Sequence, residues 1–245
     1  MCNSKLLENK IALITGCSRG IGLAILQLFI EQGAKVYAVA RTQGALDSFE
    51  SNPNCIPVYM DVTNHDQVKE LFVKIKKEQN HLDILVNNAG IMKDAVIGMI
   101  SRTQIEETYA VNVFAVIEMI QYASKFFKRQ CSGSIINISS IMGTQGNAGQ
   151  MLYSSTKGAV AALTKSASKE LAHLGIRVNA IAPGAIDTDM LHSIGEENIN
   201  KILKSIHVGR LGTPLEVAQT ALFLAGDMSK YVTGQIIGVD GSMIV

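Results

Sequence analysis

The chain of 245 residues carries 22 Lys and Arg against 21 Asp and Glu, which gives a formal net charge of +1 at pH 7. This balance excludes the broad basic footprint of a nucleic-acid-binding protein, and no apolar stretch approaches the ~20 residues of a membrane-spanning helix. The opening MCNSKLLENK lacks the apolar region of a signal peptide, so we expect a cytoplasmic protein. The four cysteines, Cys2, Cys17, Cys55 and Cys131, show no CxxC spacing, which predicts reduced thiols and no metal site.

Short apolar runs alternate with amphipathic segments along the chain. Seven runs predict strands, at 11–15, 36–40, 56–60, 84–88, 134–139, 177–182 and 235–240. Helical periods fall near 20–32, 64–79, 103–129, 152–174 and 214–226. Continuous apolar runs are typical of strands buried on both faces, as in a parallel sheet. Strand–helix alternation predicts a doubly wound α/β fold, and the lack of linkers or repeats predicts one domain over residues 1–245.

The first strand–helix connection is rich in glycine. In GCSRGIG, residues 16–22, the glycines are Gly16, Gly20 and Gly22. Glycines at this place let the backbone approach a phosphate, which the first N–H groups of the next helix would bind. The spacing is GxxxGxG and not the GxGxxG of the usual dinucleotide-binding turn. A phosphate-binding turn and a tight turn without a ligand are therefore both open at this point.

A second motif, YSSTK, places Tyr153 and Lys157 four residues apart and so on one face of a helix. A free tyrosine has a pKa near ~10, and a lysine ammonium beside it favours the phenolate and lowers that pKa. Such a pair can move protons to or from a carbonyl oxygen. An ordinary pair of side chains on a solvated helix is the alternative.

These motifs resemble, in order and approximate spacing, those of the short-chain dehydrogenases/reductases. The matching segments are TGCSRGIG at 15–22, NNAG at 87–90, Asn112 in YAVNV, Ser140 in NISS, YSSTK at 153–157, and PG at 183–184 followed by Thr188. The resemblance covers essentially the whole chain. It implies a Rossmann-type fold with a seven-stranded parallel sheet, helices on both faces and a cofactor across the carboxyl ends of the strands. The C-terminal half is similar to 3-oxoacyl-[acyl-carrier-protein] reductases in particular.

The resemblance implies catalytic roles for four residues. Tyr153 would be the acid in carbonyl reduction and the base in the reverse direction, and Lys157 would lower the pKa of Tyr153 and hold the nicotinamide ribose. Ser140, 13 residues before Tyr153, would orient the substrate carbonyl, whereas Ser139 would be packed or bonded to backbone. Asn112 would anchor a water of the proton relay, a role compatible with a helix-interior Asn that bonds to backbone.

The resemblance also implies a set of cofactor-binding residues at the carboxyl ends of the strands and on the YSSTK helix. They are Gly16, Ser18, Arg19, Gly20, Ile21, Gly22, Arg41, Asp61, Val62, Asn88, Ala89, Gly90, Tyr153, Lys157, Pro183, Gly184, Ile186 and Thr188. Asp61 would meet the adenine, and capping of a helix that starts near Thr63 is the alternative. Pro183 and Gly184 would hold the nicotinamide end, and a plain strand-ending turn is the alternative there.

Two arginines predict NADP(H) as the cofactor rather than NAD(H). An NAD enzyme has Asp or Glu for the ribose 2′-hydroxyl at the end of the second strand, where this chain has Ala40 followed by Arg41. Arg19 lies inside the glycine-rich turn as well. Two guanidinium groups would grip a 2′-phosphate through charge-assisted hydrogen bonds, and solvated surface arginines are the alternative.

Two positions depart from the family pattern. Cys17 stands in the glycine-rich turn where small residues are usual. Its thiol would pack as a small apolar side chain or, with thiolate character, act as a redox sensor. Ser242 stands where the similar reductases often have a second glycine, which puts only the local C-terminal packing in doubt.

A lid is expected over residues 189–207. Ile199, Ile202, Leu203 and Ile206 recur at helical spacing and would form one apolar face. That face would close over an acyl chain and exclude water, or it would pack on the domain.

The resemblance favours NADPH-dependent reduction of a 3-oxoacyl thioester, as in fatty-acid biosynthesis, by a homotetramer. The helices around 103–129 and 152–174 would pair between subunits, and the apolar residues Met243, Ile244 and Val245 would lie at a second interface. The substrate would be a small-molecule carbonyl compound that an acyl carrier protein can present, with no nucleic-acid or membrane partner.

Two missing arginines keep another substrate open. Similar reductases present arginines beside the active-site mouth for the acidic carrier, and these positions hold Cys131 and Leu174. Neighbours such as Lys128, Arg129 and Lys169 would have to attract the carrier at long range. A reductase or dehydrogenase for another ketone or alcohol, sugar-derived or from specialised metabolism, is thus the alternative. The third reading is a non-catalytic dinucleotide-sensing regulator, against which the intact catalytic set argues.

Overall fold

The computed structural model describes residues 5–245, and its strands form one parallel sheet in the order β3-β2-β1-β4-β5-β6-β7. The strands are β1 (Ile11–Thr15), β2 (Lys35–Ala40), β3 (Cys55–Tyr59), β4 (Ile84–Asn87), β5 (Gly133–Ile138), β6 (Ile176–Pro183) and β7 (Ile236–Val239). The chain order reverses between β1 and β4, at the centre of the sheet, which is where α/β sheets open a crevice for ligands. The predicted doubly wound sheet is confirmed, with every predicted strand shifted by at most one residue at either end.

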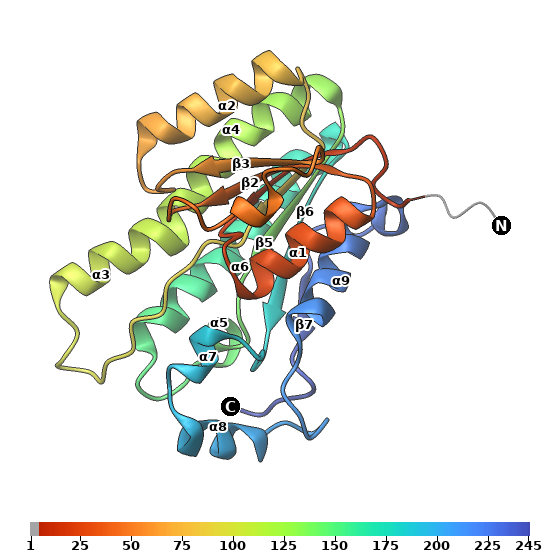
Figure 1. Ribbon diagram of the computed structural model, residues 1–245. Coiled ribbons are helices and arrows are strands. Elements are labelled where there is room, and N and C mark those ends of the chain that lie inside the picture. Colours follow the sequence, from red (N-terminus) through yellow and green to blue (C-terminus); the bar gives the residue numbers. More distant parts are fainter. Residues whose placement is uncertain (1–4) are drawn as a thin grey trace.

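Helices cover both faces of the sheet (Figure 1). On one face lie α1 (Gly20–Glu31) and α9 (Pro214–Ala225), and on the other lie α2 (His65–Glu78), α4 (Ala115–Gln130) and α6 (Met151–Leu171). Successive side chains of a strand point to opposite faces. In β1, Ala12 and Ile14 therefore belong to the first core layer, and Ile11 and Leu13 belong to the second.

The segment predicted as one helix over 103–129 is divided. It consists of α3 (Arg102–Tyr109), a π-helical turn (Ala110–Phe114) and α4. A π turn inserts an extra residue into the helix and is frequent at functional sites. Periodicity over the whole segment stays helical, so the interruption leaves little trace in the sequence pattern.

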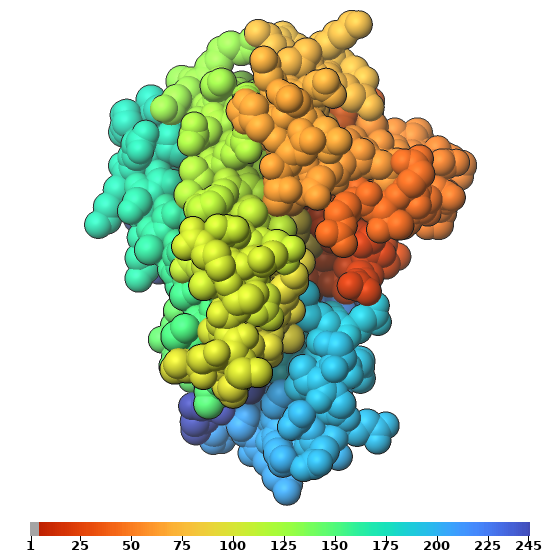
Figure 2. Space-filling view, turned by 90° about the vertical axis from the view of Figure 1, so that its left-hand side faces the viewer, coloured from red at the N-terminus to blue at the C-terminus, as the bar shows by residue number. Residues whose placement is uncertain are grey.

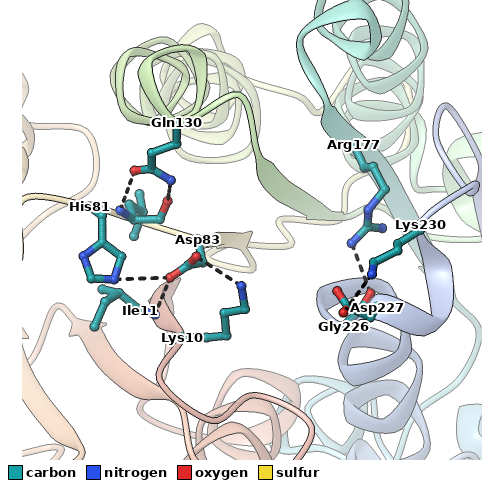
Figure 3. Close-up of polar contacts among 10 residues, drawn as sticks. Lys10, Ile11, His81, Asp83, Gln130, Arg177, Gly226, Asp227 and Lys230 are labelled. Atoms are coloured by element: carbon teal, nitrogen blue, oxygen red, sulfur yellow. Dashed lines mark hydrogen bonds and ion pairs between the residues drawn. The ribbon is translucent and has the colours of Figure 1, made fainter.

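The amino ends of the central strands are closed by two polar clusters (Figure 3). In the first, Asp83 Oδ2 accepts a hydrogen bond from Ile11 N at 2.8 Å, and Lys10 Nζ lies 3.4 Å from Asp83 Oδ1. In the second, the guanidinium of Arg177 donates to Gly226 O at 3.4 Å, directly after α9. A cavity of about 550 Å³ lies between the clusters. These contacts fix the strand starts, and the larger cleft lies at the carboxyl ends.

A buried chain of polar side chains joins the sheet to α6. Asn87 Nδ2 donates to Asn137 Oδ1 at 2.8 Å, and Asn137 Nδ2 donates to Thr164 Oγ1 at 2.9 Å. The Thr164 hydroxyl donates in turn to Val160 O at 2.7 Å. Buried amides need such partners, because an unpaired polar group in the core is costly. The chain therefore fixes how α6 sits on β5.

The described residues lack two features that would indicate other classes of protein. Within residues 5–245 no helix has both the length and the apolar character of a bilayer span. The same residues contain no group of three or more His, Cys, Asp and Glu side chains gathered for a metal ion. Cys2 lies outside the described residues.

The Asn137–Thr164 contact yields a stability prediction. Thr164→Val should lower the free energy of unfolding by about 1–3 kcal/mol, because the buried Asn137 amide loses its acceptor. Urea denaturation followed by circular dichroism measures this loss. The control is Thr220→Val, since the Thr220 hydroxyl bonds only back to Glu216 O within α9, and its loss should be below about 0.5 kcal/mol. Equal losses in the two variants would contradict the assignment.

Candidate active site

The turns after β1 and β4 are joined by hydrogen bonds at the centre of the sheet. Thr15 Oγ1 accepts from the backbone N–H groups of Asn88 and Ala89, each at 3.0 Å. The Asn88 amide donates to the carbonyls of Thr15 and Gly16, also at 3.0 Å. A Cβ on Gly22 would overlap Gly16 O and the Asn88 amide. Only glycine fits there, so the glycine-rich turn is built around this close approach.

The start of α1 is arranged for an anion. Arg19, the N-cap residue, makes no capping bond with its side chain, and the first turn holds no acidic residue. The first N–H groups of a helix have no partner within the helix and carry the positive end of its dipole. Gly20, with φ of +57°, turns this end toward the cleft. The arrangement favours the phosphate-binding interpretation over a tight turn without a ligand.

One cleft of about 770 Å³ runs along the carboxyl ends of the strands. Its lining includes every residue that the sequence suggested for the cofactor: Gly16, Ser18, Arg19, Gly20, Ile21, Gly22, Arg41, Asp61, Val62, Asn88, Ala89, Gly90, Tyr153, Lys157, Pro183, Gly184, Ile186 and Thr188. Ser140 lines the cleft beside Tyr153 and Lys157, whereas Asn112 is buried behind the lining at 1% exposure.

The catalytic candidates come from β5 and α6. Ser140 follows β5, and Tyr153 and Lys157 lie on α6. Lys157 Nζ donates to Ile138 O at 2.8 Å and lies 5.7 Å from the centre of the Tyr153 ring. Ser139 and Ser140 both line the cleft, but the Ser139 hydroxyl donates to Lys157 O at 2.8 Å and so is bonded to backbone.

Burial changes the acid–base properties of the pair. It raises the pKa of Tyr153 to about 12, with a hydrogen bond from Ser140 opposing and the charge of Asp94 adding to the shift. It also lowers the pKa of Lys157 to about 8. Desolvation disfavours the charged form of both groups. The net shift of Tyr153 is opposite to the lowering expected from Lys157 alone, and it keeps the phenol protonated near neutral pH.

Asn112 holds the loop after β4 against α6. Its Oδ1 accepts from Ile91 N at 2.9 Å, and its Nδ2 donates to Ile91 O at 2.9 Å and to Thr156 Oγ1 at 3.1 Å. A Cβ added to Gly90 would lie 3.4 Å from Asn112 Oδ1 and 3.5 Å from Lys157 Nζ. The Asn112 amide of the π turn and the Lys157 ammonium therefore both lie beside Gly90.

At the other end of the cleft, Asp61 does not cap the helix that follows it. Asn64 is the N-cap of α2, because its side chain accepts from Gln67 N, so Asp61 is not the helix cap. Asp61 Oδ1 instead accepts from Thr63 N at 2.8 Å. Arg41 lies exposed at the cleft, directly after β2, with no carboxylate at Ala40.

Cys17 behaves as a packing residue. Its side chain is fully buried in the core layer of α1 and α9 and donates to Ile14 O at 3.2 Å. Burial raises the pKa of its thiol well above the ordinary range. A redox sensor requires an accessible thiolate, so the structure excludes that interpretation of Cys17.

The segment expected to form a lid, residues 189–207, contains two short helices, α7 (Asp189–His192) and α8 (Glu196–Leu203). Ile206 lies beyond the end of α8. Ile202 lines the cleft, where it could cover an acyl chain. Ile199 is buried, as expected of a residue that packs on the domain. In the space-filling view the lid segment (blue) forms the lower end of the molecule (Figure 2).

Sequence reasoning found only part of the wall around the substrate end of the cleft, the segment 189–207. Further lining residues are Met92, Asp94, Val111, Met142, Asn147, Gln150, Met190, Leu191, Ile194, Asn198, Lys201 and Met243. None of them belongs to a motif with a chemical signature, and they meet only because the loop after β4, the π turn, the segment between β5 and α6, residues 189–207 and the C-terminus converge.

Comparison with known proteins finds a matching family model and several similar reductases. Residues 16–243 match the family model described as "Enoyl-(Acyl carrier protein) reductase". The chain is 42% identical to the 3-oxoacyl-[acyl-carrier-protein] reductase of Thermotoga maritima, over 98% of this chain and 99% of the relative. It is 40% identical to the enzyme of the same name from Chlamydia trachomatis, over 98% and 99%. It is 36% identical to that from Vibrio cholerae, over 97% and 98%.

Proposed function

Because the chain belongs to the short-chain dehydrogenase/reductase family of oxidoreductases, we propose that it is a 3-oxoacyl-[acyl-carrier-protein] reductase. It would use a nicotinamide dinucleotide to reduce the ketone of a 3-oxoacyl thioester to a hydroxyl group. One observation carries the proposal: the chain is similar over nearly its full length to reductases of that name and holds Ser140, Tyr153 and Lys157 in one cleft.

The site favours a carbonyl over a carbon–carbon double bond, the bond that an enoyl reductase would reduce. Ser140 and Tyr153 are two hydroxyl-bearing residues that line the same cleft. Together they can donate to one oxygen, and the reduction of a ketone puts negative charge on that oxygen. The names of the relatives and the two hydroxyl groups therefore indicate the same reaction, the reduction of a ketone.

The mechanism follows from the geometry of the cleft. When bound, the nicotinamide supplies the hydride. Tyr153 donates the proton from its phenol oxygen to the substrate oxygen, and Ser140 orients that oxygen by a hydrogen bond. Burial opposes the phenolate that remains. The Lys157 ammonium, charged below pH about 8, offsets this cost by its proximity. Asn112 holds the loop beside Lys157 in place.

The chain's own residues fit a nicotinamide dinucleotide. Backbone approach at Gly22 and the unpaired N–H groups of α1 suit the pyrophosphate. We further propose NADP(H) as the cofactor form, because Arg41 and Arg19 line the cleft near the end of β2 and no carboxylate stands at Ala40. Arg19 is not bound tightly elsewhere, since its ion pair with Asp189 is long, at 3.6 Å, and solvated.

We also propose that the protein is a homotetramer in the cytoplasm. Phe114, Ile117 and Met151 expose large apolar surfaces on the π turn, α4 and α6, which are the helices that would pair between subunits. Such exposed patches commonly mark interfaces. Ile244 and Val245 are exposed at the C-terminus as well. Cys17, Cys55 and Cys131 are free thiols, which suits a reducing compartment.

One observation favours a different ketone as substrate. Cys131 and Leu174 occupy the positions where similar reductases carry carrier-binding arginines, and neither can attract an acidic surface. Both lie just before the amino ends of β5 and β6, at the opposite edge of the sheet from Tyr153. Neither residue lines the cleft that holds Tyr153, so within one chain they do not lie beside the mouth of the active site, contrary to the expectation from the sequence.

The substrate is tested by NADPH oxidation with acetoacetyl-CoA, acetoacetyl-carrier protein, keto sugars and cyclic ketones. We expect turnover of the thioesters. If both thioesters are inert while a free ketone reacts, the reductase acts on another substrate. If NADPH binds and no compound reacts, the chain is a dinucleotide-sensing regulator. A preference for the carrier-bound form that disappears at high salt would indicate basic docking without the two arginines.

Tyr153→Phe should fold, bind cofactor and lose at least about 10²-fold in kcat, because the proton donor is removed. Stopped-flow and steady-state absorbance at the nicotinamide band measure the rate. The matched control is Tyr231→Phe, since Tyr231 is fully exposed at the far end of the molecule and should keep the wild-type rate. A Tyr153→Phe variant with near-normal kcat means that another group supplies the proton.

Arg41→Ala should lower the ratio of kcat/KM for NADPH over NADH by at least about tenfold, the effect of losing one charge-assisted contact of ~1.5–3 kcal/mol. The control is Arg102→Ala, an exposed arginine of α3 paired with Glu106. An unchanged ratio in Arg41→Ala, or comparable use of both cofactors by the wild type, would refute the assignment.

Light scattering at micromolar concentration should give the mass of four chains. Replacing Phe114 and Ile117 by Ser should reduce that mass, because the exposed apolar surface of the π turn and α4 would be lost. A wild-type monomer would refute the assembly.

A further inference from the structure

A small apolar cluster closes the substrate end of the cleft. We call Ile141, Ala185, Ile206 and Met243 the C-terminal apolar cluster; all four are buried, with Met243 at 6% exposure. Partly buried Met142, Leu191 and Ile202 pack on the cluster and also line the cleft. Ile141 directly follows Ser140, so the cluster begins next to a hydroxyl that would hold the substrate carbonyl.

The C-terminal segment holds Met243 in this position. Gly241 and Ser242 take φ values of +60° and +57°, which turn the chain sharply. Ser242 N donates to Asp240 Oδ1 at 3.0 Å and supports this conformation without glycine. Ile244 N donates to Ser205 O at 3.0 Å, and Met243 pairs with Ile206 across an antiparallel bridge. The end of the chain is therefore fastened to the residues that follow α8.

The chemistry of this part of the wall suits an alkyl chain. Met142, Leu191, Ile202 and Met243 present carbon and sulfur to the cleft and no charged atom. The polar residues that α8 adds to the lining include Lys201, and its ammonium is paired with Glu197 at 2.7 Å. A fatty acyl chain leaving the carbonyl beside Ser140 can exchange water for apolar contact along this wall.

We propose that the acyl chain of the substrate lies against the C-terminal apolar cluster and that Met243 forms the end of its binding site. Met243 would therefore set the longest acyl chain that the enzyme accepts in full contact. This inference rests on the proposed reduction of 3-oxoacyl thioesters. Each methylene that gains apolar contact strengthens binding by roughly fourfold, from ~0.8 kcal/mol per CH₂. Preference should rise with chain length until the chain meets Met243.

The test compares kcat/KM for 3-oxoacyl-CoA substrates with 4, 8 and 12 acyl carbons. Met243→Ala removes three side-chain atoms and should raise the ratio of the 12-carbon to the 4-carbon value by at least about fourfold, one methylene's contact. Met243→Phe replaces a flexible side chain with a rigid ring and should lower that ratio by at least as much. Met228→Ala and Met228→Phe are the matched controls, because Met228 is exposed in the turn after α9, and their ratios should equal that of the wild type.

Each outcome decides a separate question. If the wild type reduces no thioester, the proposed function fails, and the inference fails with it. If it reduces all three thioesters but the ratio is the same in the wild type and both Met243 variants, the inference alone is wrong. Should the Met243 variants not fold by circular dichroism, Ile202→Ala and Ile202→Phe probe the same wall from α8. An unchanged ratio in those variants would also overturn the inference.

Discussion

The site depends on the close packing of α6 against the end of β5. Lys157 is a buried cation, and its ammonium bonds to Ile138 O at 2.8 Å. That bond requires the helix to lie almost on the strand. Gly143 lies in α5 (Met142–Gln145), the short helix after β5, and lets α5 pack closely on α6, because a Cβ there would come within 2.6 Å of the Lys157 backbone. Ser139 then bonds to Lys157 O, so the orientation of Ser140 into the cleft follows from the same contact.

The same packing places the acid–base groups under electrostatic strain. Burial disfavours both the phenolate of Tyr153 and the ammonium of Lys157. It therefore raises the pKa of Tyr153 to about 12 and lowers the pKa of Lys157 to about 8. A neutral phenol beside a lysine that is charged at neutral pH is a suitable resting state for proton donation. The charge that forms on Tyr153 as its proton leaves is the charge that Lys157 can stabilise, so the lysine offsets part of the cost that burial imposes on proton donation.

The two ends of the cleft are constructed differently. At the cofactor end, backbone makes the surface beside α1, because a Cβ at Gly16 or Gly22 would overlap neighbouring atoms and the first N–H groups of α1 face no acidic side chain of that turn. At the substrate end, side chains of loops, lid and C-terminus make the wall. A backbone surface is fixed by sterics and hydrogen bonds, whereas a wall of side chains changes with each substitution. The fold can therefore keep one cofactor chemistry while the substrate pocket varies.

The sequence by itself determined the features encoded by local pattern. Apolar runs located the strands to within one residue, and the motifs that contain Ser140, Tyr153 and Lys157 carried the resemblance that implied a reductase. Periodicity reports which residues face a core, but it does not report how two elements meet. The π turn at Asn112, the N-cap at Asn64, the upward shift of the Tyr153 pKa and the place of Met243 all arise from contacts between distant segments. Only the tertiary structure decided them, because burial and hydrogen-bond partners exist only once the segments have packed together.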